Sequence, residues 1–186
     1  MKMLLASKEQ KIALGLILLA VATRLLPHPP NFAPITGIAL FAAARFQSKF
    51  LAVLIPFLSL FLTDLFLGLS AISGFVYAGF GLILLLGFQT KKMGITTVLL
   101  SSVLFFVVSN LGVWLLHYPL TVEGFTTCFT LAIPFFTNTL LGDLVYTGAL
   151  FFSFSSIKQY ILQPRSGFIY LSLCCSRFFV VKMKRE

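Results

Sequence analysis

The sequence predicts an all-α membrane protein, a bundle of about six transmembrane helices with its N-terminus and C-terminus in the cytoplasm. Hydrophobic residues make up 59% of the 186 residues, charged residues only 10%, and the mean hydropathy is +1.01. Apolar runs alternate with short connections, and basic residues gather in every second connection. A soluble domain of this size would need more polar surface than these charges provide.

Each predicted span is an apolar run of roughly the 20 residues that a helix needs to cross the bilayer, bounded by charged or turn-forming residues. The first follows a basic segment; a cleaved signal peptide is the alternative there, but the apolar run resumes after "AVA" at 20–22. The second is shorter than a full crossing, and the last is long enough to reach into the interface. The predicted spans cover about residues 11–26, 33–45, 50–69, 72–90, 94–116 and 127–155.

The distribution of basic residues supports this division, because cytoplasmic connections carry the excess of lysine and arginine. Leaving out the short second span would place every later basic connection on the wrong side of the membrane. The clusters are Lys2, Lys8 and Lys11; Arg45 and Lys49; Lys91 and Lys92; and Lys158 and Arg165. We therefore expect one polytopic membrane domain over residues 1–155.

The remaining segment, residues 156–186, is expected to be a basic cytoplasmic or interfacial tail. Its apolar part, from residue 166, is too short for a comfortable span and contains Arg177. The net charge of +9 indicates contact with lipid head groups, not with nucleic acid. Three cysteines, Cys128, Cys174 and Cys175, form no evident disulfide framework and are expected to be free thiols.

Two carboxylates lie inside predicted spans, where a charge is costly and each ionisable group is a candidate functional residue. Asp64 falls in the outer half of the third span and Asp143 in the inner half of the sixth, so their depths should differ by something like 10–15 Å. A proteolytic dyad at one depth is therefore not expected, and Leu140 replaces a glycine of the Gly-x-Gly-Asp signature. No other catalytic motif appears, so we do not expect an enzyme.

Ion pairs offer a structural explanation for both carboxylates. We expect Asp143 to pair with Arg45 or Lys49 at the cytoplasmic interface. An Arg24–Asp64 pair is expected near the outer face.

Several polar residues converge on the outer half of the bundle, which predicts a ligand cavity open to the exterior. The connection "RLLPHPPNFAPITG" at 24–37 holds half of the chain's eight prolines, whose fixed φ angles would make it a rigid exterior cap. Proline residues within spans three and six could also mark a cavity, although such kinks are common in structural helices. The candidate binding residues are Arg24, His28, Asn31, Asp64, Asn110, Trp114 and Asn138.

Other features have weaker functional interpretations. His28, His117 and Cys128 map to the outer face, but their spacing matches no metal-ligand motif, so neither metal nor cofactor is expected. Trp114 is expected in an interfacial aromatic belt, with stacking on a ligand as the alternative. Ala39 and Ala43 form a small-residue face that could pack within the chain or dock a partner helix.

The blocks "RLLPHPPNFAPITGIALF", "DLFLG", "SNLGVWL" and "AIPFFTNTLLGDLVYT" resemble those of a family of bacterial multi-pass membrane proteins of unknown function. The resemblance covers about residues 20–152. The family is distantly similar to the substrate-binding S components of energy-coupling factor (ECF) transporters. That similarity implies six helices, uptake of a vitamin or metal ion, an outward site, and docking on a coupling subunit with its ATPases. The alanine motif of those proteins lies in the first helix, whereas Ala39 and Ala43 lie in the second.

The leading hypothesis from the sequence is thus a substrate-binding membrane protein of the transporter type, with a small-molecule ligand. The alternative is a structural or assembly protein of the bacterial envelope, in which the same polar groups only join helices.

Overall fold

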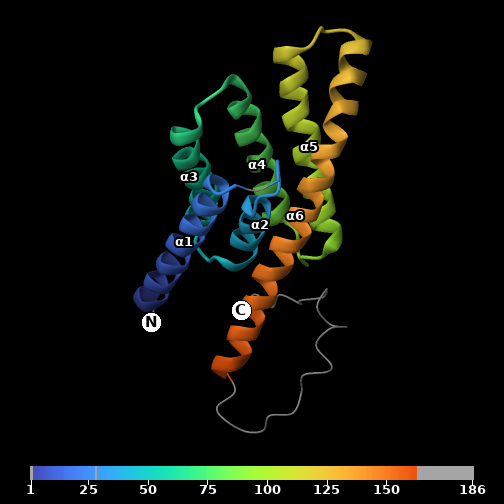
Figure 1. Ribbon diagram of the computed structural model, residues 1–186. Helices are drawn as coiled ribbons and strands as arrows, with labels where there is room; N and C mark the ends of the chain where they lie inside the picture. The colour runs from blue at the N-terminus through green and yellow to red at the C-terminus, as the bar shows by residue number, and fades with distance from the viewer. Residues whose placement is uncertain (1, 28, 163–186) are drawn as a thin grey trace.

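The computed structural model describes residues 2–27 and 29–162, and the secondary structure of this part of the chain consists of helices without strands. Its helices follow one another with short connections (Figure 1). They are α1 (Lys2–Leu25), α2 (Ile35–Arg45), α3 (Lys49–Leu67), α4 (Ala71–Gln89), α5 (Ile95–His117) and α6 (Val122–Leu162). The predicted all-α fold is confirmed. The apolar segment from residue 166 lies outside the described residues.

Within the described residues, four helices are long and apolar enough to cross a membrane: α3, α4, α5 and α6. The apolar α2 is shorter; its 11 residues span about 16 Å, roughly half of the hydrocarbon layer. Helix α6 has 41 residues and is about 60 Å long, so it extends past both ends of the predicted span. Neither Pro56 in α3 nor Pro134 in α6 ends its helix.

The two kinds of connection lie at opposite ends of the bundle. Those that join α2 to α3 and α4 to α5, which carry Arg45, Lys49, Lys91 and Lys92, lie together at what we call the basic end (Figure 1). The α3–α4 and α5–α6 connections lie at the other end. This arrangement matches the alternation in the sequence, and the assignment of the basic end to the cytoplasm stays a prediction.

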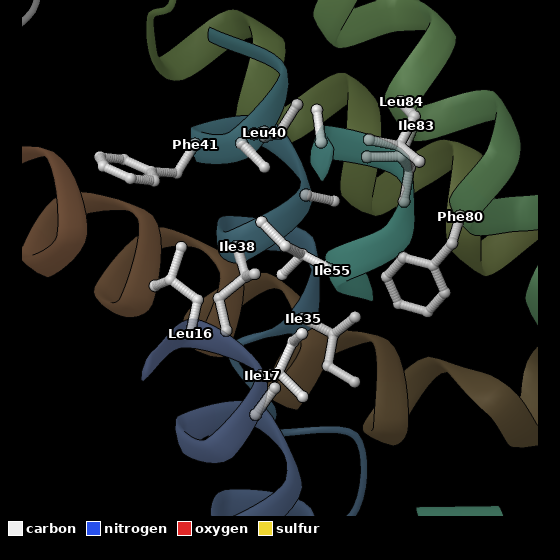
Figure 2. Packing of buried hydrophobic residues seen from close by; sticks show 14 of the residues in the cluster. Leu16, Ile17, Ile35, Ile38, Leu40, Phe41, Ile55, Phe80, Ile83 and Leu84 are labelled. Atoms are coloured by element: carbon white, nitrogen blue, oxygen red, sulfur yellow. The ribbon is translucent and has the colours of Figure 1, made fainter. Parts of the chain in front are cut away.

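Helix α2 lies at the centre of the bundle. It packs against each of the other helices, whereas α1 packs only against α2 and α3, and α6 only against α2 and α5. Ile38, Ala39 and Leu40 of α2 are fully buried, and Figure 2 shows side chains of α1, α3 and α4 packed around this helix. Because lipid is as apolar as leucine, close packing more than burial itself holds such helices together.

The surface of the bundle is apolar. Leu18 of α1, Phe66 of α3 and Leu131 of α6 are each more than half exposed. Exposed side chains of this kind on several helices are typical of a surface that faces lipid.

Candidate functional site

A polar cluster joins the ends of three helices. We call it the Arg24–Asp64 cluster, and it consists of Arg24 in the last turn of α1, Thr63 and Asp64 near the end of α3, and Tyr77 of α4. One guanidinium nitrogen, Nη2, lies 3.2 Å from Oδ1 of Asp64, so the ion pair predicted from the sequence is present. The phenol of Tyr77 donates to Oδ2 of the same carboxylate at 3.0 Å.

Thr63 also forms a hydrogen bond with the guanidinium of Arg24. Its hydroxyl is within hydrogen-bond distance of the carbonyl oxygens of Ser59, at 3.0 Å, and Leu60, at 2.9 Å. Because the single hydroxyl hydrogen is directed to its own helix, an oxygen lone pair accepts from Nη1 of Arg24 at 2.7 Å. The guanidinium is thus fixed by two partners on α3.

The cluster is partly open. The side chain of Arg24 is 20% exposed and that of Asp64 is 9% exposed. The interactions described use only two of the five N–H donors of the guanidinium, and a carboxylate offers about four lone-pair sites. A small molecule with a charged group could therefore bind here without first breaking every existing hydrogen bond.

The connection before α2, which the sequence predicts to be an exterior cap, lies against α6 at some distance from the end of that helix. Nδ2 of Asn138 donates to the carbonyl of Pro30 at 3.1 Å, and the ring of Phe32 contacts that of Tyr146 with 5.4 Å between centroids. Asn138 lies 16 residues after the start of α6, which places this contact about 24 Å along the helix. His28, another predicted site residue, lies outside the described residues.

Asn31 adopts a left-handed backbone conformation with φ of 64°. Asparagine tolerates this region, but a β-branched side chain there is strained. We expect Asn31→Val to lower the free energy of unfolding by about 1–2 kcal/mol, and Asn31→Gly to have little effect. Thermal unfolding of the purified variants in one detergent would measure this, and equal losses for both would contradict the backbone explanation.

The structure does not bring Asn110 and Trp114 into contact with Arg24 or Asp64. Asn110 donates to the carbonyl of Phe106 in its own helix, and Trp114 donates to the carbonyl of Pro119 at 3.1 Å. The indole of Trp114 also packs edge-on against Phe125 of α6. These contacts stay within the α5–α6 hairpin, and α5 packs against neither α1 nor α3.

The small-residue face of α2 is used inside the chain. Ala39 is fully buried, and a Cβ on Gly87 of α4 would lie only 2.8 Å from Cβ of Ala43. Ala43 therefore lies in the close contact between α2 and α4, which favours packing within the chain over docking of a partner helix.

A second polar cluster lies between α2, α5 and α6. We call it the Asp143 cluster, and it consists of Asp143 with the hydroxyls of Thr36 and Ser102. Asp143 is 2% exposed, and its Oδ2 lies 2.6 Å from Oγ of Ser102. Neither hydroxyl partner was predicted from the sequence, where the only signal is a pair of serines, 101 and 102, in an apolar run.

The ion pair expected between Asp143 and Arg45 or Lys49 is wrong. Asp143 meets Thr36 in the first turn of α2, whereas Arg45 is nine residues farther on, about 13 Å along the axis. The Arg45 guanidinium instead lies over the rings of Phe151 and Phe154, at 5.4 and 4.9 Å from their centroids. Within the described part of the chain, the Arg24–Asp64 pair is the one salt bridge found.

Among the described side chains, Asp143 therefore has no cation to offset its burial. An ionised carboxylate away from water costs several kcal/mol unless it is paired. The N-terminus of α2, near Thr36, stabilises a negative charge by about 0.3–1 kcal/mol, and by up to about 2 kcal/mol in a partly buried site. Burial is the larger of the two effects.

The two carboxylates belong to separate clusters on helices that do not pack against each other, since α3 and α6 are not in contact. A shared-proton dyad is thus not formed. In residues 2–27 and 29–162 no group of three or more histidine, cysteine, aspartate or glutamate side chains is placed to hold a metal ion.

Comparison with protein families matches residues 6–165 to the model described as "Family of unknown function (DUF6580)". The match covers most of the chain, which therefore belongs to this family. No curated protein matches the chain. No solved structure matches it either.

Proposed function

We propose that this member of the DUF6580 family binds a small solute at the Arg24–Asp64 cluster, as the substrate-binding subunit of an uptake system. The observation that carries the proposal is the partly exposed ion pair, held by Thr63 and Tyr77 at the junction of three helices. An ionisable pair within apolar helices is a candidate for solute binding, because a purely structural role would be filled at lower cost by apolar residues.

The geometry favours a solute that carries charge. An acidic group would accept from the free N–H donors of Arg24, and a basic group or a metal ion would approach the carboxylate of Asp64. A solute that carries both an acidic and a basic group would exchange the internal ion pair for two external ones. Of the vitamin and metal-ion classes expected from the sequence, vitamins with carboxylate or ammonium groups fit this chemistry better, because one carboxylate beside a guanidinium is a poor metal site.

At the level of the assembly, the proposal rests on the distant resemblance of the sequence blocks to those of the S components of ECF transporters. In that arrangement the protein would dock on a membrane coupling subunit with its ATPases, in the inner membrane of a bacterium. The internal packing of Ala43 against Gly87 means that docking would use another surface.

Solute retention tests the binding proposal. The wild-type protein, purified in mild detergent from its native membrane, is extracted, and the released small molecules are identified by mass spectrometry. We expect at least one compound to be retained by the wild type and lost from Asp64→Asn and Arg24→Gln, because each variant removes one charge of the pair. Lys92→Gln, which removes an exposed charge at the basic end, is the matched control and should retain the compound.

Identical extracts from the wild type and both cluster variants, with all proteins eluting as single species, would refute the proposal. Co-purification separates it from the alternative of an envelope assembly protein. Recovery of a coupling subunit with ATPases supports uptake, and recovery of cell-wall assembly proteins supports the alternative.

A further inference from the structure

The Asp143 cluster contains more hydrogen-bond acceptors than the hydroxyl hydrogen of Ser102 can serve. Oγ of Ser102 lies 2.6 Å from Oδ2 of Asp143 and 3.1 Å from the carbonyl oxygen of Val98. A serine hydroxyl has one hydrogen, and a carbonyl oxygen has none. If Ser102 donates to Val98, the short contact with Asp143 needs a hydrogen on the carboxyl group itself.

Burial favours the state in which that hydrogen is present. Asp143 is 2% exposed, and Ser102 is fully buried. A neutral carboxylic acid that donates to Ser102, while Ser102 donates to the Val98 carbonyl, gives each of these groups a partner without placing a net charge in the interior. The hydroxyl of Thr36, the other partner, can donate to a carboxyl oxygen whether or not the group carries a proton.

Among the described side chains, the charged and titratable groups on the surrounding helices do not compensate an ionised Asp143. On α2 the basic residue is Arg45, whose guanidinium lies over two phenylalanine rings of α6. On α5 it is His117, in the last turn and 15 residues from Ser102, about 22 Å along the axis. On α6 itself, Glu123 is in the first turn, Cys128 is 15 residues before Asp143, about 22 Å along the axis, and Tyr146 packs against Phe32 of the connection before α2. The side chain of Lys158, also on α6, lies outside the described part of the structure.

We propose that Asp143 is a proton-binding site, in which the carboxylic acid donates to Ser102 and is enclosed by α2, α5 and α6. On release, the O–H bond of the acid breaks and the proton passes to a water molecule. The electron pair stays on the carboxylate, and the hydroxyl hydrogen of Ser102 turns from Val98 to Oδ2. Because such a change places a charge between three helices, proton release requires water to reach the cluster.

A second buried hydroxyl marks one direction from which water could come. Oγ1 of Thr147, one turn after Asp143 on α6, is buried and has no hydrogen-bond partner. It lies beside Gly37 of α2, where an added Cβ would be 3.0 Å from it. Because α2 and α6 are in close contact here, a water molecule could reach this unpartnered hydroxyl, next to the Asp143 cluster, only if the two helices moved apart.

Infrared spectroscopy of the full-length protein in lipid nanodiscs tests the proposal, because the C=O stretch of a carboxylic acid is resolved from that of a carboxylate. At neutral pH the wild type should show a carboxylic-acid band that is lost in Asp143→Asn. The same band should shift to higher wavenumber in Ser102→Ala, which removes the acceptor of the acid hydrogen. In Asp64→Asn, the matched control on the other carboxylate, the band should be unchanged.

Coincident spectra of the wild type and Asp143→Asn in this region at neutral pH would overturn the proposal. If Asp143→Asn does not fold, Ser102→Ala decides, because an unshifted band or the absence of a band excludes an acid bonded to Ser102. The result is independent of solute binding, since the Arg24–Asp64 cluster lies on other helices.

Discussion

Arg24→Leu is expected to lower the free energy of unfolding by about 2–4 kcal/mol, because it leaves the carboxylate of Asp64 buried without its cation. The value lies at the lower side of losses for fully buried pairs, since the Arg24 side chain is 20% exposed. Unfolding in mixed micelles with increasing denaturing detergent would measure the loss. Lys92→Leu, an exposed cation at the basic end, should have little effect.

The double variant Arg24→Leu with Asp64→Leu distinguishes this cause from lost packing. Removing both charges removes the unpaired carboxylate, so most of the stability should return. A double variant as unstable as Arg24→Leu alone would show that the arginine side chain contributes through its packing and not through the ion pair.

Gly87→Leu is expected to destabilise the bundle by about 1–3 kcal/mol, or to prevent its assembly, because α4 approaches α2 too closely for a side chain there. A Cβ at this position would lie 2.8 Å from Cβ of Ala43. Gly81→Leu on the same helix is the matched control, since the nearest atom to its added Cβ would be 3.9 Å away. The yield of monodisperse protein and its thermal unfolding would compare the two.

A compensating pair makes this prediction specific. Gly87→Ala should be destabilising alone and close to wild type when combined with Ala43→Gly, because the methyl group then moves from one helix to the other. Additive losses in the combined variant would mean that the Ala43 contact is not what limits the approach of α2 and α4.

The helices were predictable because hydropathy and the spacing of basic residues act over whole segments. Even the short α2 is indicated by Arg45 and Lys49, which fix the side on which it ends. The ends of α6 were not predictable, since "VEGFTTC" and "SSIKQYIL" contain no proline, so nothing in the local sequence forces the helix to stop.

The ion pair of the Arg24–Asp64 cluster was also predictable. Arg24 and Asp64 are opposite charges near the same predicted face, so their attraction indicates a pair without knowledge of helix packing. The partners of Asp143 were not predictable, because serine and threonine in apolar helices commonly bond their own backbone and give no sign of a distant acceptor. Asn110 and Trp114 share a predicted depth with Arg24, but depth alone does not say which helices are neighbours.

Two pairs of helices, which we call lobes, are joined through α2 and α4. Helices α1 and α3 form one lobe and α5 and α6 the other; neither lobe touches the other directly, whereas α2 and α4 touch both. The Arg24–Asp64 cluster draws on the first lobe and the Asp143 cluster on the second. The two polar clusters therefore lie in parts of the bundle that are connected only through α2 and α4, so a substitution in one cluster can influence the other only through the packing of these two helices.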